Sequence, residues 1–365
     1  MAQERPAALT WTTSAPVLAL VGLALTWGRH LPIVVVLVVA VLLVGAVLAA
    51  VHHAEVVAHR VGEPMGSLVL AVAVTIIEVA LIVTLMASGK DSESLARDTV
   101  FAAVMITCNG IVGLALLVGS LRHHTVTFNA EGTGSALACV VTLATVCLVL
   151  PTFTTAAPGP EFSGSQLTFA AVASLAVYGL FVFNQTVKHR DFFLPVVPDA
   201  TPEPDSETHA EPPSDRTALI SLGLLLVSLV GVVGLAKVAS PSIEDGVDAL
   251  GLPPTFVGVV IALLVLLPET LAAVRAARRN MVQTSLNLAL GSAMASIGLT
   301  IPVIAVASIW LDGPLHLGLE PTQLVLLAMT VAVSVLTIVP GRATRLQGGV
   351  HLVLAAAFVF LAANP

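Results

Sequence analysis

The feature that most constrains the fold is a succession of long apolar segments. A helix needs about 20 predominantly apolar residues to cross the hydrocarbon of a bilayer. On that criterion eleven spans are predicted, near residues 14–28, 32–51, 67–88, 99–121, 134–153, 167–187, 217–238, 254–275, 284–311, 320–340 and 347–363. Only 10% of the residues are charged, whereas soluble domains carry about 25%. The sequence therefore predicts an all-α integral membrane protein.

The distribution of Lys and Arg predicts the orientation in the membrane. An odd number of spans places the two termini on opposite sides. Eleven basic residues fall on the side of the N-terminus: Arg5, Arg60, Arg122, Lys188, Arg190, Arg216, Arg275, Arg278, Arg279, Arg342 and Arg345. Four fall on the other side: Arg29, Lys90, Arg97 and Lys237. Because cytoplasmic loops carry the excess of positive charge, we expect a cytoplasmic N-terminus and an external C-terminus, in the inner (plasma) membrane.

One segment interrupts the apolar pattern. Residues 188–216 contain six prolines and seven acidic residues against three basic ones, a composition typical of a disordered linker. This acidic, Pro-rich cytoplasmic linker divides the chain. Residues 1–31 hold the N-terminus and the first span, residues 32–187 form a first five-span repeat, and residues 217–365 form a second.

Each predicted repeat carries one acidic residue well inside a span. Glu78 lies in span 67–88 and Glu269 in span 254–275, and each is followed by a span that supplies small and polar residues. A unit of five helices inverts the second copy relative to the first, because five is odd. Paired inverted repeats with a midplane site are an architecture of secondary transporters. We therefore expect the two glutamates to meet at one site, although two protonated and silent acids are the alternative.

The surroundings of the glutamates are rich in oxygen donors. Pro268 removes a backbone hydrogen bond just before Glu269, which predicts either a helix break that lines a cavity or an ordinary kink. Asn109 contributes an amide to span 99–121. Hydroxyl groups follow one face of span 284–311 at helical spacing, at Ser285, Ser292, Ser296 and Thr300.

Carboxylate, amide and hydroxyl oxygens favour Ca²⁺, which prefers 6–8 oxygen ligands in flexible geometry, while Na⁺ or another monovalent cation stays open. No thiol or imidazole is expected at that depth, which argues against zinc and copper. Two neighbouring carboxylates raise each other's pKa, and a divalent cation reverses the effect. A site that holds protons then cannot hold the cation, and a site that holds the cation cannot hold protons. This mutual exclusion is the chemistry of an antiporter.

The same residues resemble a known family, the calcium/proton exchangers of the cation/calcium exchanger superfamily, in its bacterial proton-antiporter branch. The first family repeat reads approximately G-x-x-x-G-G-L-L-N-A-T-F-G-N-A-T-E. Five residues match it in register: Gly62, Gly66, Leu68, Ala71 and Glu78. The resemblance extends over nearly the whole chain, including eleven helices and an acidic loop between the sixth and the seventh.

The second family repeat, G-N-A-A-E-H, aligns its glutamate with Glu269. Its continuation resembles RRNMVQTSLNLALGSA and places Gly291 and Ser292, and Asn109 matches the asparagine that follows the first repeat. The resemblance implies exchange of cytoplasmic Ca²⁺ for external H⁺, with Glu78 and Glu269 as shared carriers of cation and proton. Ca²⁺ is then a transported substrate and H⁺ the counter-ion, and no cofactor is expected.

The chain departs from the family where G-N-A precedes each glutamate. These positions are Val74, Thr75 and Ile76 in the first repeat and Val265, Leu266 and Leu267 in the second. Thr75 replaces one of the lost amides as a candidate ligand. The predicted metal ligands are Glu78, Glu269, Asn109, Ser292, Ser296 and Thr75. The departures leave room for Na⁺ or K⁺.

Other classes of function explain the sequence less well. An intramembrane enzyme would need a nucleophile and a base or a metal cage, and no His, Asp or Cys is expected beside either glutamate. A channel is disfavoured because buried acids in opposed repeats suit alternating access. Nucleic acid is not an expected partner, since the chain has no basic stripe. The lipid bilayer is the obligatory partner, and a homo-oligomer is left open. Within transport, a monovalent cation/proton antiporter is the rival.

Overall fold

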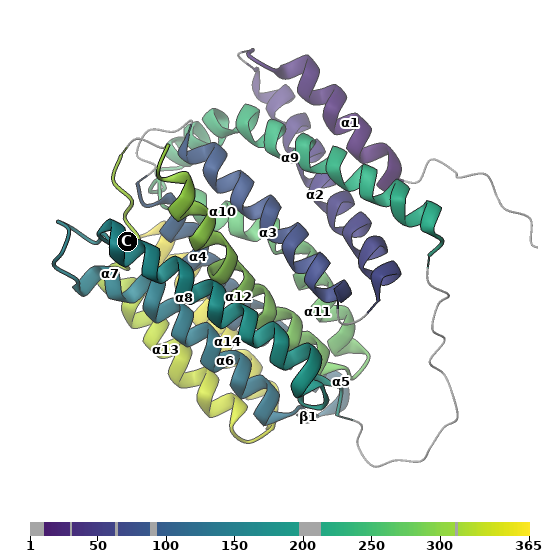
Figure 1. Cartoon of the computed structure of the whole chain (residues 1–365), viewed down its shortest axis with the longest axis vertical. Coiled ribbons are helices and arrows are strands. Elements are labelled where there is room, and N and C mark those ends of the chain that lie inside the picture. Colours follow the sequence, from purple (N-terminus) through teal and green to yellow (C-terminus); the bar gives the residue numbers. More distant parts are fainter. Residues whose placement is uncertain (1–10, 30, 63–64, 88–92, 197–212, 311–312) are drawn as a thin grey trace, which may run out of the picture. The chain divides into compact units, whose positions relative to one another are not determined.

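The fold is a set of helices in two compact units. The computed structural model describes residues 11–29, 31–62, 65–87, 93–196, 213–310 and 313–365 (Figure 1). Within these residues the only sheet is a pair of two-residue strands, β1 (Val126–Thr127) and β2 (Arg342–Ala343), which pair antiparallel. Each unit combines helices from both halves of the sequence, and each is described by itself. The repeat boundaries at 31, 187 and 217 stay a prediction.

The first unit contains α1 (Trp11–Thr26), α2 (Ile33–Val61), α3 (Met65–Met86) and most of α9 (Asp215–Ala249). Helix α2 packs against both α1 and α3. Helix α9 approaches α1 closely, since a Cβ added to Gly231 would lie only 3.0 Å from the Ala19 Cβ. An ion pair between Arg60 and Asp215 joins α2 to the start of α9.

The second unit holds the remaining helices. They are α4 (Leu95–Met105), the π-helical turn η1 (Ile106–Ile111), α5 (Val112–His123), α6 (Ala130–Ala144), the π-helical turn η2 (Thr145–Val149), α7 (Leu150–Phe153), α8 (Gly164–Phe183), the π-helical turn η3 (Asn184–Lys188), the 3₁₀ turn η4 (Arg190–Phe193), α10 (Phe256–Val265), α11 (Leu267–Arg278), α12 (Val282–Ala307), α13 (Pro321–Ile338) and α14 (Arg345–Ala363). Helix α12 lies at the centre, because it packs against α4, α5, α6, α8 and α11.

The predicted spans are confirmed. Within the described residues, eight helices or continuous helical runs are long and apolar enough to cross a membrane, and the bent pair α10–α11 forms a ninth span. Two shorter apolar helices, Trp11–Thr26 and Ala73–Met86, fall on the predicted spans 14–28 and 67–88. The chain is therefore an all-α multi-pass membrane protein, and each predicted span has a helical counterpart.

Several helices begin where the local sequence supplies a cap. Ser163 and Gln166 form a capping box at the start of α8, and Thr344 and Gln347 form one at the start of α14. In each box the side chain at the cap and the side chain three residues later satisfy backbone N–H groups that the first turn leaves without partners. These short polar motifs thus mark the ends of the spans.

The linker is described only at its ends, because residues 197–212 lie outside the described part of the chain. The prediction of disorder for that stretch therefore stays a prediction. The beginning of the linker packs against the second unit: Phe193 is buried, and its ring meets the Phe181 ring edge to face at 5.8 Å. The expected linker therefore begins later than residue 188.

Helix α4 begins at Leu95, four residues before the predicted span, and this places a charged pair inside the fold. Arg97 and Asp98 are each only 4% exposed. The Arg97 Nε donates to Asp98 Oδ1 at 2.8 Å, and an Nη donates to Glu320 Oε1 at 3.1 Å. The placement of Arg97 outside the spans was therefore wrong. The Arg97–Glu320 ion pair joins the start of α4 to the start of α13.

Replacing Arg97 with alanine is expected to lower the free energy of unfolding by about 3–5 kcal/mol, because removal of one partner leaves the Asp98 carboxylate buried without its counter-ion. The measurement is the thermal unfolding midpoint of the purified protein in detergent. The matched control is Arg342→Ala, since Arg342 is exposed. Equal midpoints for the two variants would contradict a stabilising role for the buried pair.

Candidate functional site

Glu269 follows a break in its span. Helices α10 and α11 meet at Leu266 with a bend of 52°. Pro268 lies in the first turn of α11, where the missing N–H of proline costs nothing and its fixed φ suits the helix. The span is therefore interrupted at Pro268, and the lining of a cavity by this break stays a prediction. The break places Glu269 in the first turn of α11 with 7% of the residue exposed.

The position of Glu269 along α11 suits a buried anion. The N-terminus of a helix carries partial positive charge, which favours an ionised carboxylate there. Nine residues separate Glu269 from Arg278, the last residue of α11, so the acid lies about 14 Å along the helix axis from its basic end. That distance is close to half of the ~30 Å hydrocarbon thickness. Arg275 lies nearer, six residues after Glu269, so the depth of the carboxylate in the membrane stays a prediction.

Helix α12 places the predicted hydroxyl groups beside α11. The two helices pack against each other, and the Ser285 hydroxyl donates to the Ala273 carbonyl at 2.7 Å. Ser296 is buried, and Ser292, one turn earlier, is half-buried. The Thr300 hydroxyl is buried and has no hydrogen-bond partner among the described residues. The stripe thus divides into one hydroxyl that joins helices and three that remain candidates for ion binding.

Asn109 lies at the middle of the continuous helical run Leu95–His123, inside the π-helical turn η1. It is fully buried. Its Nδ2 donates to Thr330 Oγ1 at 2.8 Å, and its Oδ1 lies 3.2 Å from Nδ1 of His351. Both partners belong to α13 and α14, whereas η1 also packs against α12 and contacts α11. The amide is thus hydrogen-bonded on the side of α13 and α14, and its role as a cation ligand stays a prediction.

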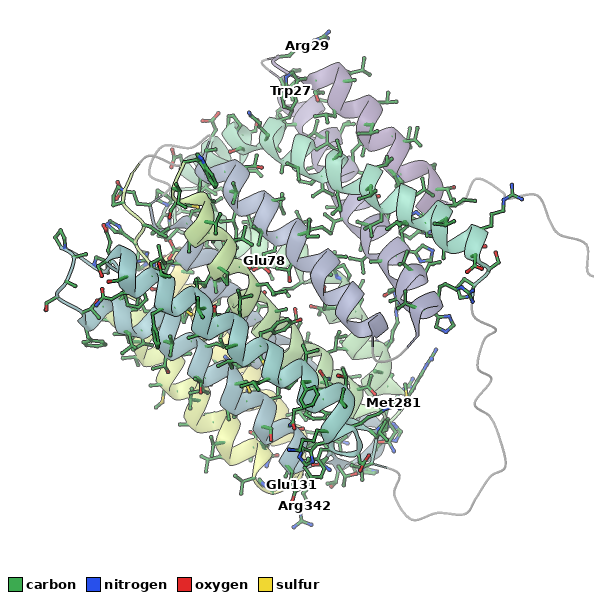
Figure 2. All side chains as sticks on the ribbon, viewed as in Figure 1. Trp27, Arg29, Glu78, Glu131, Met281 and Arg342 are labelled. Carbon is green, nitrogen blue, oxygen red and sulfur yellow. The ribbon has the colours of Figure 1, made fainter. Side chains whose placement is uncertain are left out.

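Glu78 and Thr75 belong to the first unit. Both lie on α3, three residues apart, so they share one face of that helix (Figure 2 labels Glu78). Their exposed fractions are 3% for Glu78 and 5% for Thr75. Asn109, Glu269, Ser292 and Ser296 belong to the second unit. In the second unit the helical elements that carry the candidates pack against one another, and the meeting of the two glutamates at one site stays a prediction.

His351 is a residue that sequence reasoning missed. No imidazole was expected at the depth of the site. This expectation is wrong, because the imidazole of His351 contacts Asn109, one of the predicted ligands. The only sequence signal is a single histidine in the apolar run of the last span, VHLVLAAAFVF. Among the residues that the structure describes, no group of three or more His, Cys, Asp or Glu side chains is placed to hold a metal ion.

Comparison with protein families decides the class of the protein. The sequence pattern of the family described as "Sodium/calcium exchanger protein" matches residues 31–187 and 220–363. The chain belongs to this family. Membership in the cation/calcium exchanger superfamily is thereby confirmed, and the family is one of transporters. The match leaves out the N-terminal helix and the segment between the two matched ranges.

Three relatives in bacteria cover most of the chain. A protein of Sinorhizobium fredii whose name calls it an ionic transporter, y4hA, is 46% identical over 97% of this chain and 96% of its own length. The sodium-potassium/proton antiporter ChaA of Escherichia coli is 36% identical over 94% and 93%. A Ca²⁺/H⁺ antiporter of Aphanothece halophytica is 26% identical over 84% of each chain. The named relatives therefore include a proton antiporter for Na⁺ and K⁺ and a proton antiporter for Ca²⁺.

Solved structures share the fold. Native YfkE superposes with a TM-score of 0.72 at 16% identity, covering 97% of this chain and 99% of its own. The H⁺/Ca²⁺ exchanger CAX superposes with a TM-score of 0.69 at 14% identity, covering 96% and 91%. The resemblance to the calcium/proton exchanger branch is confirmed at the level of the fold. The predicted all-α membrane fold is shared with these exchangers, and the inverted repeats stay a prediction.

Proposed function

We propose that the protein exchanges Ca²⁺ for H⁺ across the membrane by alternating access. The observation that carries the proposal is the pair of buried glutamates, Glu78 at 3% and Glu269 at 7% exposure, one in each half of an exchanger-family chain. A carboxylate inside a bilayer is expensive, so acids in such positions mark ion and proton pathways. Each glutamate has the burial that a shared carrier of cation and proton requires.

The chemistry of the exchange follows from the two carboxylates. When both are ionised they attract a divalent cation, and neutral oxygens from Asn109, Ser292 and Ser296 complete its coordination. When both are protonated, the charge that held the cation is absent. Because Ca²⁺ accepts 6–8 oxygens with variable geometry, a mixed set of carboxylate, amide and hydroxyl donors suits it. Thr75, one turn before Glu78, supplies a further oxygen.

A monovalent cation is the second candidate substrate. The sodium-potassium/proton antiporter of Escherichia coli is more similar in sequence to this chain than the Ca²⁺/H⁺ antiporter of Aphanothece halophytica, at 36% against 26% identity. The apolar residues Val74 and Ile76 also leave fewer oxygen ligands near Glu78 than the family motif provides. This departure leaves room for Na⁺ or K⁺. Proton-coupled exchange of Na⁺ or K⁺ therefore uses the same two glutamates.

The proposed location is the inner membrane, with the N-terminus in the cytoplasm. The excess of Lys and Arg on the side of the N-terminus supports this orientation. The basic turn at the end of α11, with Arg275, Arg278 and Arg279, then faces the cytoplasm. A cation entering from the cytoplasm would reach Glu269 along α11. Protons would enter the site from the external face.

Everted membrane vesicles test the substrate. After respiration has acidified the lumen, added Ca²⁺ is expected to raise the lumenal pH, because the exchanger carries Ca²⁺ inward and H⁺ outward. A pH-sensitive dye measures the change, and vesicles without the protein are the control. If Na⁺ or K⁺ alone raises the lumenal pH, the second candidate is correct. If no cation raises it above the control, proton-coupled exchange is wrong.

A further inference from the structure

A chain of hydrogen bonds in the second unit ends on the side chain of Asn109. The Thr330 hydroxyl donates to the Leu326 carbonyl at 2.8 Å, one turn earlier in α13. A hydroxyl has a single hydrogen, so Thr330 Oγ1 is an acceptor toward Asn109, whose Nδ2 lies 2.8 Å away. The Leu326 carbonyl cannot donate. With the Thr330 hydrogen on the Leu326 carbonyl, the Asn109 amide places Nδ2 toward Thr330.

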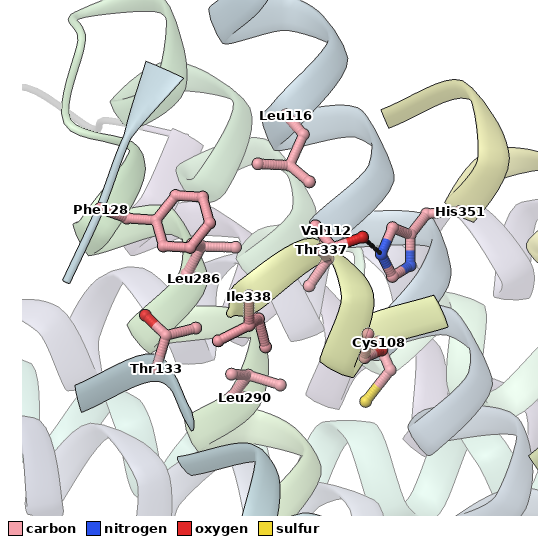
Figure 3. Close-up of a pocket in the computed structure, with 11 residues that line it drawn as sticks. Cys108, Val112, Leu116, Phe128, Thr133, Leu286, Leu290, Thr337, Ile338 and His351 are labelled. Atoms are coloured by element: carbon pink, nitrogen blue, oxygen red, sulfur yellow. Dashed lines mark hydrogen bonds between the residues drawn. The ribbon is translucent and has the colours of Figure 1, made fainter. Parts of the chain in front are cut away.

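The same orientation dictates the tautomer of His351. With Nδ2 of Asn109 on Thr330, its Oδ1 is the atom that faces Nδ1 of His351, at 3.2 Å. A carbonyl oxygen accepts, so the imidazole must carry its hydrogen on Nδ1. The other ring nitrogen, Nε2, then accepts from the Thr337 hydroxyl at 3.1 Å (Figure 3). In a neutral imidazole one nitrogen donates and the other accepts, which fits these two bonds, and the Cys108 carbonyl is a further acceptor for the ring.

Close packing holds the imidazole against η1. Helices α5 and α14 cross where Gly113 faces Gly348, and a Cβ on Gly113 would lie 3.1 Å from both the Gly348 carbonyl oxygen and the His351 Cβ. The two glycines let the backbones approach closely, as small residues do between membrane helices. His351 itself is fully buried. The crossing thus delivers its ring to the π-helical turn that contains Asn109.

We propose that His351 is a positioning residue that fixes the Asn109 amide for cation binding. The inference rests on the proposed function. An asparagine side chain can turn so that its nitrogen and oxygen exchange places, and the donor at His351 Nδ1 prevents that turn. The imidazole also borders a cavity of about 10 Å³, so its removal would give the amide room to rotate. The turn η1 contacts α11, which carries Glu269, and α12, which carries Ser296. The orientation of the Asn109 amide therefore affects which of its atoms faces the ligands on these two helices.

Transport kinetics of four variants test the proposal. His351→Ala is expected to raise the KM for the added cation, Ca²⁺ or K⁺, by about 5- to 100-fold with a smaller change in maximal rate. His351→Asn retains an N–H near the place of Nδ1 and is expected to recover most of the affinity. His351→Gln moves that donor by one methylene and is expected to fail. Thr337→Val removes the partner of Nε2 but leaves the contact with Asn109, and it is expected to raise KM less than His351→Ala does.

A packing control separates positioning from stability. Leu352→Ala trims the same α5–α14 crossing, because Leu352 lies against Gly113, and the leucine side chain cannot hydrogen-bond to the Asn109 amide. It is expected to lower the thermal midpoint while leaving KM unchanged. The proposal is overturned if Leu352→Ala raises KM as much as His351→Ala does, or if the asparagine and alanine variants at position 351 behave alike.

Nitrogen NMR of histidine-labelled protein tests the geometry without transport. The signal assigned to His351, identified by its loss in His351→Gln, is expected to show the Nδ1–H tautomer, which is the minor form of imidazole in water. Asn109→Ala is expected to change that signal. An Nε2–H tautomer in the wild-type protein would overturn the proposal. Failure of Ca²⁺ and K⁺ transport with the Nδ1–H signal present would instead fault the proposed function.

Discussion

Replacing Glu269 with glutamine is expected to reduce cation-driven proton exchange by about 100-fold or more. The substitution keeps the size of the side chain and removes its charge. Glu269 is 7% exposed in the first turn of α11, so an incoming cation would lose the charged ligand that we propose for it in the second unit. Removing one member of a buried charge pair costs about 3–5 kcal/mol, which corresponds to that decrease. Dye measurement in everted vesicles gives the rate.

Two further variants serve as comparisons for Glu269→Gln. Glu78→Gln in the first unit is expected to abolish exchange to the same degree, since both carboxylates are proposed to hold one cation. Glu131→Gln is expected to have no effect, because Glu131 also lies in the first turn of a helix, α6, but is exposed. A normal rate for either Glu269→Gln or Glu78→Gln would exclude the carrier role of that glutamate.

Replacing Gly348 with alanine is expected to prevent the α5–α14 crossing and to cost about 3 kcal/mol of stability or more. A Cβ on Gly348 would lie 2.6 Å from the Leu117 nitrogen and 3.0 Å from the Gly113 carbonyl oxygen. These are backbone atoms, which cannot turn aside as a flexible side chain can. The helices would have to separate, and the yield of monodisperse protein and its thermal midpoint would both fall.

The neighbouring glycine is the control. Gly349 follows Gly348 in the same helix, and nothing lies within 4 Å of a Cβ added there. Gly349→Ala is expected to stabilise α14 by up to about 1 kcal/mol, because alanine favours helix over glycine. A midpoint for Gly348→Ala equal to that of Gly349→Ala would show that the two backbones do not approach as closely as described.

The number of spans was predictable because it depends on a local property. Twenty apolar residues in a row must form a helix in lipid, where every backbone group has to be paired within the segment. The break at Pro268 was predictable for a similar reason, since proline has no N–H in any surroundings. The start of α4 was misjudged because Arg97 looks like a loop residue until its partner Glu320 is known. That partner is 223 residues away.

The candidate site likewise has one part that the local sequence indicated and one part that it did not. The two glutamates were recognisable because a carboxylate in an apolar run is rare and costly. The environment of Asn109 was not recognisable, because its partners Thr330 and His351 lie 221 and 242 residues further along the chain. Nothing in the local sequence around Thr330 or His351 distinguishes an ordinary buried polar residue from one that orients an amide.

The sequence by itself determined which segments are long and apolar enough to cross the membrane, where one of them breaks, and that Glu78 and Glu269 are buried, but not that Asp98 is. These properties follow from the solvation of single residues and from the backbone chemistry of proline, which act within one helix. Only the tertiary structure decided which polar groups pair, such as Arg97 with Asp98 and Glu320, and Asn109 with His351. Pairing depends on how closely distant helices approach, and that distance is set by glycines such as Gly113 and Gly348 whose role appears only at the crossing.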